Sequence, residues 1–356
     1  NVASGEELGA SLVLSIDGDI LIDLWGGFRD QARTLPWDEH TITNVWSTTK
    51  TMTFLCALML ADRGELDFHA PVARYWPEFA AGGKAAVEVR HLMAHSAGLS
   101  GWTAHLDPED LADWEKCTSL LAAQEPWWEP GTASGYHALT QGYLIGEVVR
   151  RITGATIGTW FASEVAAPLG ADFHIGLPAS EDGRVSPIIP PPAMGLAGAD
   201  PSDIAVRTFT SPLLDAAMAT QEWWRRAEIP AANGQGNARS VAAVQSIIAG
   251  SGEARGVRLL SSKGCDVVFE EQSNMKDLVL GMPMRFGMGY GLSGDLMPMG
   301  PRACFWGGYG GSLIVMDQDA RLTVSYIMNR MEGGLTGDFR GANVVMAAVM
   351  GLAGSA

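Results

Sequence analysis

Strand patterns lie at both ends of this 356-residue chain, and helical patterns fill the long stretch between them. Residues 10–15 and 20–25 are apolar, β-prone runs separated by Asp17-Gly18, a strong signal for a two-residue hairpin turn. Residues 312–316 and 322–328 flank a polar turn in the same way. Two hairpins so far apart in sequence predict one antiparallel sheet to which both ends of the chain contribute strands.

The middle of the chain has the periodicity of helices, interrupted by loops rich in proline and glycine. Helices are predicted over residues 87–93, 111–124, 139–151, 156–166 and 239–248. A further strand at 303–306 and a last helix at 341–352 complete the pattern. We therefore predict an α+β fold, with an antiparallel β-sheet flanked by helices plus a mainly helical subdomain. The predicted division assigns residues 1–45 and 240–356 to the α/β part and residues 46–239 to the mainly helical part.

The composition is that of a chain that buries a large core, because 47% of its residues are hydrophobic and only 18% are charged. The formal net charge of -16 argues against nucleic acid and anionic membrane surfaces as partners, since both demand a basic face. The longest apolar runs, residues 54–61 and 344–352, are far short of the roughly 20 residues that span a bilayer. We therefore expect a small-molecule substrate and no nucleic-acid or membrane partner.

Four cysteines are spread along the chain without a Cys-x-x-Cys spacing. They are Cys56, Cys117, Cys265 and Cys304. This pattern predicts free thiols and neither a zinc site nor a redox motif. Free thiols fit a reducing compartment, so a cytoplasmic location is expected. No feature of the sequence indicates the oligomeric state.

Ser47 and Lys50 form a Ser-x-x-Lys pattern at the predicted start of a helix, where residues three apart share one face. The apolar run that follows, residues 51–61, predicts a helix that is buried on all sides. A lysine entering such a helix must be paired or neutral, because burial of an unpaired ammonium lowers its pKa. A neutral lysine beside a serine can activate the hydroxyl as a nucleophile, although the pattern alone is also that of an ordinary helix cap.

Two further segments carry groups that acyl transfer needs. Tyr136 lies in a turn-rich loop just before the helix predicted at 139–151, where a phenol near an ammonium can act as an acid or a base. Residues 307–311 place four glycines between two predicted strands, a pattern typical of close approach by a ligand. The alternatives are a loop tyrosine packed on the core and a bulged hairpin corner.

Three motifs together carry a family resemblance: Ser47-Thr48-Thr49-Lys50, Tyr136-His137-Ala138 and Trp306-Gly307-Gly308. In their order and spacing they resemble the motifs of the serine β-lactamase and penicillin-recognising superfamily, in particular the class C-like branch called family VIII carboxylesterases. The resemblance implies a β-lactamase/transpeptidase-like fold with the active site in a cleft between its two parts. It also implies Ser47 as nucleophile, Lys50 and Tyr136 as the base and acid pair, and no metal or organic cofactor. The oxyanion hole would consist of the backbone N–H groups of Ser47 and Tyr309.

Two positions depart from the β-lactamase pattern. The second motif ends in Ala138 where those enzymes have asparagine, and the third begins with Trp306 where they have lysine. An indole in place of an ammonium removes a partner for a carboxylate and adds apolar area, which favours short-chain, neutral esters over β-lactams. We assign substrate binding to residues of the second and third motifs and to one tryptophan of the 127–128 pair, which could equally belong to the core. These residues are Trp306, Gly307, Gly308, Trp128 and His137.

The sequence therefore predicts a serine carboxylesterase that works through an acyl-enzyme on Ser47. An acyltransferase, or a hydrolase of small amides or β-lactams, could use the same residues. A penicillin-binding-like sensor that is acylated without turnover is a third alternative. Whether Lys50 or Tyr136 is the base is left open at this point.

Overall fold

The computed structural model describes residues 2, 4–191 and 200–353. Within these ranges the fold centres on an eight-stranded antiparallel sheet with the strand order β2-β1-β13-β12-β11-β10-β9-β8. Its strands are β1 Gly9–Ile16, β2 Asp19–Gly27, β8 Ser273–Lys276, β9 Pro283–Phe286, β10 Gly291–Leu292, β11 Ala303–Gly307, β12 Leu313–Asp317 and β13 Leu322–Met328.

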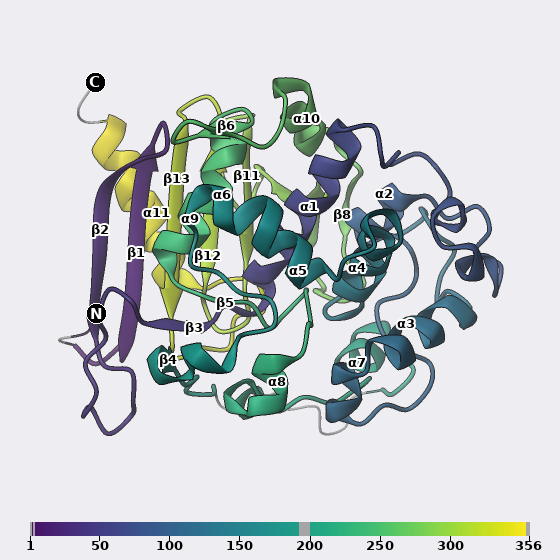
Figure 1. Ribbon diagram of the computed structural model, residues 1–356, viewed down its shortest axis with the longest axis horizontal. Helices are drawn as coiled ribbons and strands as arrows, with labels where there is room; N and C mark the ends of the chain where they lie inside the picture. Colours follow the sequence, from purple (N-terminus) through teal and green to yellow (C-terminus); the bar gives the residue numbers. More distant parts are fainter. Residues whose placement is uncertain (1, 3, 192–199, 354–356) are drawn as a thin grey trace.

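Both ends of the chain contribute strands to this sheet, as the sequence predicts. The β1–β2 hairpin turns at Asp17 and Gly18, which both have positive φ angles, 55° and 81°. β1 then pairs antiparallel with β13, from Ala10 opposite Met328 to Ile16 opposite Leu322. The first and last strands of the chain are therefore neighbours, with only β2 between β1 and one edge of the sheet (Figure 1).

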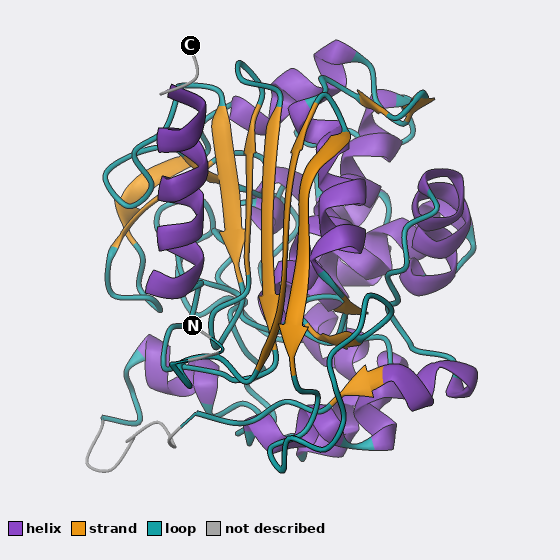
Figure 2. Cartoon of the chain, turned by 90° about the vertical axis from the view of Figure 1, so that its left-hand side faces the viewer, coloured by secondary structure: helices purple, strands orange, loops and turns teal. Residues whose placement is uncertain are grey.

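Helices cover both faces of the sheet, so that it forms the central layer (Figure 2). α9 packs on β1, β12 and β13 from one side, whereas α11 packs on β12 and β13 from the other. α1 lies between the sheet and the helices of the middle segment, and nearly every residue of α1 is buried. The helices are α1 Lys50–Asp62, α2 Val89–Met93, α3 Trp114–Ala123, α4 Thr140–Thr153, α5 Ile157–Phe161, α6 Ala167–Leu169, α7 Ile204–Phe209, α8 Glu222–Arg226, α9 Ala238–Ala249, α10 Ser262–Asp266 and α11 Phe339–Ala353.

The helices that the sequence predicts in the middle segment are present, but some begin or end a few residues away from the predicted bounds. Capping residues explain where α3 begins and where α4 ends. α3 begins after Asp113, whose carboxylate accepts the N–H of Lys116 and caps the helix. α4 ends at Gly154, which takes a left-handed conformation with φ of 74°. A second, small sheet in this region consists of β4 Val185–Ser186, β3 Ile42–Asn44 and β5 Gln235–Gly236, and β6 Glu253–Ala254 pairs with β7 Val257–Arg258. The predicted division of the chain at residues 45 and 239 stays a prediction.

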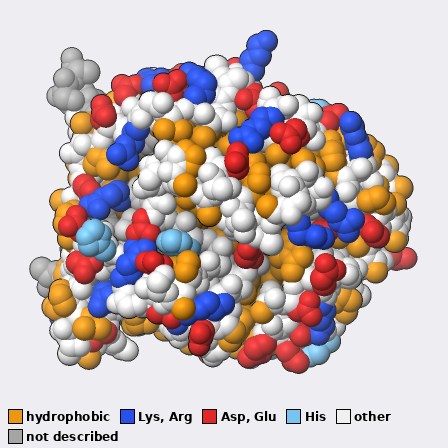
Figure 3. All heavy atoms as spheres, in the orientation of Figure 1, with side chains coloured by type: hydrophobic (Ala, Val, Ile, Leu, Met, Phe, Trp, Pro, Cys, Tyr) orange, Lys and Arg blue, Asp and Glu red, His pale blue; other side chains and the backbone are white. Residues whose placement is uncertain are grey.

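All four cysteines are buried, free thiols. No helix among the described residues is long and apolar enough to cross a bilayer. Acidic and basic side chains are both present on the face of the molecule shown in Figure 3.

Candidate active site

The first motif is presented by a sharp turn from β3 into α1. A 3₁₀ turn, η1 (Trp46–Thr49), leads directly into α1, and Trp46 has a left-handed φ of 48°, rare for a non-glycine residue. Thr49 Oγ1 donates to the Trp46 carbonyl at 2.6 Å and accepts the Gly234 N–H at 2.8 Å. These bonds hold the strained residue in place, so that Ser47 stands at the entrance of a buried helix.

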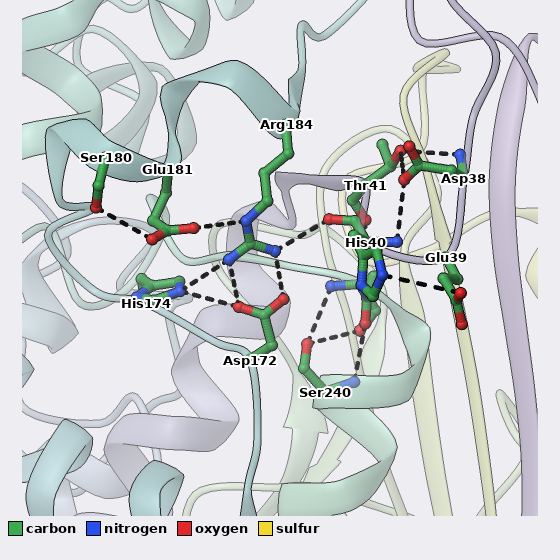
Figure 4. Close-up of polar contacts among 11 residues, drawn as sticks. Asp38, Glu39, His40, Thr41, Asp172, His174, Ser180, Glu181, Arg184 and Ser240 are labelled. Carbon is green, nitrogen blue, oxygen red and sulfur yellow. Dashed lines mark hydrogen bonds and ion pairs between the residues drawn. The ribbon is translucent and has the colours of Figure 1, made fainter.

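Behind this turn, a polar network ties β5 to the surface of the helical part. The Val45 N–H donates to Gly234 O, and the next residue, Gln235, exchanges two backbone bonds with His174. The His174 ring lies 3.0 Å from Asp172, which also binds the guanidinium of Arg184 through two contacts (Figure 4). The network lies outside the site itself and supports the strand against which the first motif is built.

Lys50 is completely buried, and its Nζ atom has three oxygen neighbours. It lies 3.1 Å from Ser47 Oγ, 2.7 Å from the Ala138 carbonyl and 3.0 Å from the Ala231 carbonyl. No carboxylate lies within 4.0 Å of it among the described residues. Burial without an ion-pair partner lowers the pKa of Lys50 well below 10.5.

Tyr136 approaches Ser47 from the other side. Its hydroxyl donates to Ser47 Oγ at 2.5 Å, and Lys50 Nζ lies 4.7 Å from the centre of its ring. Burial raises the pKa of Tyr136, and the hydrogen bond with Ser47 opposes this shift in part. The same low-polarity surroundings therefore favour a neutral amine at Lys50 and a neutral phenol at Tyr136.

The glycine-rich segment after β11 passes close to the nucleophile. A Cβ atom added to Gly308 would lie 3.3 Å from the backbone nitrogen of Ser47 and would collide with Val45 O and Ser312 Oγ. Ser312 fastens the segment further, because its hydroxyl lies 2.9 Å from both Val45 O and Thr48 Oγ1. Ser47 is in the first turn of a helix, where backbone N–H groups have no intrahelical acceptor, and the Tyr309 N–H has no acceptor among the described residues.

An apolar cavity of about 80 Å³ opens above Ser47. Among the described residues, no charged side chain is part of its wall, and most of the wall comes from residues between 46 and 232. Its lining residues are Trp46, Ser47, Tyr136, Ala138, Leu139, Thr208, Phe209, Pro212, Leu214, Ala216, Ala232, Tyr309 and Leu335.

The three predicted motifs thus meet around one serine hydroxyl, and comparison with known proteins agrees with this arrangement. A family model described as Beta-lactamase matches residues 1–347. The chain belongs to the Beta-lactamase family. Among curated relatives in this family, the Esterase/beta-lactamase LipL of Mycobacterium tuberculosis is 35% identical over 348 residues, which are 91% of this chain and 77% of the relative.

Solved structures of Beta-lactamase family relatives share the whole fold. A family VIII carboxylesterase has a TM-score of 0.93 and 44% identity, and the alignment covers 98% of this chain and 94% of that one. A penicillin-binding protein homologue from Caulobacter crescentus has a TM-score of 0.90 and 36% identity, with the same coverage. These likenesses confirm the predicted family and the predicted β-lactamase/transpeptidase-like α+β fold.

Trp306, the third-motif residue where β-lactamases have lysine, is buried beneath the cavity of this Beta-lactamase family member. Its ring stacks on His95 at 5.4 Å between centroids, and it touches Phe54 and Phe286 from the sides. Its indole nitrogen has no hydrogen-bond partner among the described residues, and the ring does not belong to the cavity lining. Trp306 supports the ring of Tyr136, whose centroid lies 6.0 Å away.

The other four predicted substrate-binding residues also lie outside the cavity lining: Gly307, Gly308, Trp128 and His137. Trp128 packs against Gly135 and His137, and its indole N–H donates to Ala133 O. The His137 ring is fully buried, and its Nε2 atom accepts the Leu99 N–H. Both side chains shape the loop that carries Tyr136, and their contact with a substrate stays a prediction.

The outer wall of the cavity contains apolar residues that the sequence analysis missed. Phe209 is the last residue of α7, Pro212 and Leu214 come from the segment that follows, and Leu335 comes from the loop before α11. None of them belongs to a motif or to a long periodic segment, so the sequence carries no signal that would have identified them.

Proposed function

We propose that this member of the Beta-lactamase family is a serine carboxylesterase that hydrolyses short-chain, neutral esters through an acyl-enzyme on Ser47. The observation that carries the proposal is the position of Ser47 Oγ, within hydrogen-bond distance of both Lys50 Nζ and the Tyr136 hydroxyl at the floor of an apolar cavity. The names of two relatives, an esterase/beta-lactamase and a family VIII carboxylesterase, support the same reaction class.

Lys50 is the general base in this proposal, because its surroundings fit a neutral amine. A neutral amine has two N–H groups and one lone pair. The carbonyls of Ala138 and Ala231 accept the two N–H groups, which leaves the lone pair for the proton of Ser47. Burial lowers the pKa of Lys50 well below 10.5, which favours the unprotonated amine that a base requires.

Acylation begins when the Ser47 proton moves to Lys50 Nζ and Ser47 Oγ forms a bond with the ester carbonyl carbon. The N–H groups of Ser47 and Tyr309 stabilise the oxyanion that results. The C–O bond to the alcohol then breaks, and the Tyr136 hydroxyl gives its proton to the departing oxygen. One proton passes from Lys50 to Tyr136, so that both return to their neutral forms.

Deacylation repeats these steps with water as the nucleophile. Lys50 and Tyr136 take one proton from water, the hydroxide oxygen attacks the acyl carbon, and the bond to Ser47 Oγ breaks. The proton returns to Ser47, and the carboxylic acid leaves. No residue beyond those at the site has to supply a charge.

The substrate class follows from the cavity wall. Within the described part of the chain, the wall has no lysine or arginine that could bind a carboxylate, and its lining is dominated by Trp46, Phe209 and leucine side chains. Neutral acyl groups gain from burial there by about 0.8 kcal/mol for each methylene group. A volume of about 80 Å³ limits that gain to short chains.

The test is hydrolysis of p-nitrophenyl butyrate by the wild type and by Ser47→Ala, with intact-mass detection of the acylated protein. Sustained turnover that is lost in the variant, together with a transient butyryl adduct on Ser47, is the expected result. Ser246→Ala is a control, since Ser246 is a buried serine on α9 whose hydroxyl bonds to Ala242 O. Equal turnover by Ser47→Ala and the wild type would refute the assignment, and a stable adduct without turnover would indicate the sensor function instead.

A second candidate activity is slow hydrolysis of β-lactams, which the printed name of the LipL relative supports for that protein. None of the described residues that line the cavity offers a cation for the carboxylate of such a substrate. We therefore expect nitrocefin turnover to be at least about tenfold less efficient than ester turnover, because a charge-assisted contact contributes about 1.5–3 kcal/mol.

We also propose that the protein works in the cytoplasm on a small-molecule substrate, without a nucleic-acid or membrane partner. Four buried free thiols and a net charge of -16 support this proposal. Cell fractionation with the native gene product is the direct measurement.

A further inference from the structure

Asp277 is a buried carboxylate that the reaction described above does not use. It follows β8 in the turn that leads to β9, and its side chain is completely shielded from solvent. No lysine, arginine or histidine lies within 4.0 Å of its oxygens among the described residues. A buried carboxylate without a counter-ion is costly unless several donors surround it, so its contacts require an explanation.

Four donors do surround it, and they come from two separate parts of the fold. Oδ1 accepts the backbone N–H groups of Val279 and Leu280 at 2.9 Å each, which close its own turn. The other two donors belong to the loop of the second motif: Ser134 Oγ donates to Oδ2 at 2.5 Å, and the Tyr136 N–H donates to Oδ1 at 3.0 Å. The bonds from Val279 and Leu280 are sufficient to close the turn. The bonds from Ser134 and Tyr136 instead connect this turn to the loop of the second motif.

A backbone hydrogen bond adds to the contacts between the β8–β9 turn and the loop that carries Tyr136. The Leu278 N–H donates to Ser134 O at 2.8 Å, and thus the β8–β9 turn and the Tyr136 loop are joined by three bonds. On its opposite side the loop is held by His95, whose carbonyl accepts the Gly135 N–H and whose Nδ1 accepts the His137 N–H. Tyr136 therefore lies between an anchor in the helical part and an anchor at the edge of the main sheet.

We propose that Asp277 is a positioning residue for the proton donor of the reaction: its carboxylate fixes the backbone of Tyr136 so that the phenol reaches the departing alcohol oxygen at Ser47. The inference rests on the proposed esterase function and adds to it a residue of the β8–β9 turn. General acid catalysis depends on hydrogen-bond distance, so a loop that moves by a fraction of an ångström weakens proton delivery before it weakens substrate binding.

A pair of butyrate esters separates this role from a general effect on folding. Ethoxide leaves only with a proton, whereas p-nitrophenolate leaves without one. Tyr136→Phe removes the proton donor and sets the reference pattern. Asp277→Ala leaves buried donors without an acceptor and should reproduce that pattern, with kcat/KM lowered about 100-fold for ethyl butyrate and less than about tenfold for p-nitrophenyl butyrate.

Asp277→Asn is the conservative variant. Its amide oxygen can accept the three N–H groups that Oδ1 accepts, and the Ser134 hydroxyl can turn to accept from the amide nitrogen. Both esters should therefore be restored to within about threefold of the wild type. Asp113→Ala is the matched control, because Asp113 is a carboxylate that caps α3 and should leave the ratio of the two rates unchanged.

The double variant Tyr136→Phe/Asp277→Ala decides between positioning and stability. It should be no slower on ethyl butyrate than Tyr136→Phe alone, since a displaced donor and an absent donor cost the same step. Equal losses on both esters for Asp277→Ala, or fully additive losses in the double variant, would overturn the proposal. If Asp277→Ala does not fold, Asp277→Glu takes its place: the added methylene should give the same selective loss, and a rate ratio equal to that of the wild type would overturn the proposal.

The esterase activity and the positioning role of Asp277 are tested by different variants. Loss of the esterase assignment would appear as wild-type turnover that Ser47→Ala leaves unchanged. Loss of the present proposal would appear as Ser47-dependent turnover in which the Asp277 variants do not discriminate between the two esters.

Discussion

Replacing Gly308 by alanine tests the oxyanion hole with a single methyl group. The new Cβ would overlap Val45 O and Ser312 Oγ, both far inside the 3.0 Å that real Cβ atoms keep from their neighbours. Val45 O is a backbone atom and Ser312 is fixed by two hydrogen bonds, so neither can turn aside. The segment that carries Tyr309 must therefore retreat from Ser47, by roughly half an ångström or more.

The size of the expected loss follows from that displacement. A misplacement of about 1 Å at a reacting centre can lower the rate about 10²-fold, and removal of one oxyanion donor lowers kcat by about 10²–10³-fold, or ~2.7–4 kcal/mol. We expect kcat for p-nitrophenyl butyrate to fall within this range in Gly308→Ala. KM should change much less, because the cavity wall is formed mainly by other segments.

Gly333→Ala is the matched control on a neighbouring loop. A Cβ atom at Gly333 would meet no heavy atom of the described residues within 4 Å, so kcat and the melting temperature should remain those of the wild type. Steady-state kinetics and thermal melts of both variants are the measurements that test the role of Gly308. A folded Gly308→Ala enzyme with kcat within about threefold of the wild type would mean that the Tyr309 N–H does not stabilise the oxyanion.

Three further outcomes are expected. Lys50→Met should lower kcat/KM at least about 10³-fold. In the wild type, kcat/KM should fall as the pH drops through the pKa of Lys50, which burial lowers well below 10.5; an acid limb near 10.5 would contradict the neutral amine. Leu335 lines both the cavity at Ser47 and a second one of about 690 Å³. Leu335→Ala should therefore join them and raise the rate with octanoate relative to butyrate about tenfold; an unchanged ratio in chain-length profiles would show that the cavities do not join. Arg184→Met should lower the free energy of unfolding by about 1–2 kcal/mol at pH 7 in urea titrations. Burial alone would raise the pKa of Asp172, but the hydrogen bonds from His174 and Arg184 outweigh burial and lower this pKa. The stability that these bonds provide is therefore present above pH 3.8 and should shrink as the pH falls further. A stability difference between Arg184→Met and the wild type that grows in acid would refute this explanation.

The sequence predicted the framework of the molecule where the pattern was regular and strong. The β1–β2 hairpin, the β12–β13 hairpin and the buried helix after Ser47 all lie where apolar periodicity placed them. The three motifs meet because each one sits next to such an element.

The missed elements are short or lack periodicity. β8 reads Ser-Asn-Met-Lys, β9 begins with a proline and β10 has only two residues, so none shows a strand pattern. Asp277 escaped notice for the same reason: an aspartate in a turn is common, and only the fold brings it to Tyr136. The cavity wall is likewise set by loop geometry that depends on long-range packing.

The pairing of β1 with β13 has a consequence for how the protein is made. During synthesis, the nucleophile turn and its helix emerge before β11 to β13 and the Tyr309 segment. Until then β1 lacks its inner neighbour, and a growing chain exposes the apolar face of an incomplete sheet. Ribosome-bound chains should therefore gain protease resistance and esterase activity together, and only after β13 has left the exit tunnel.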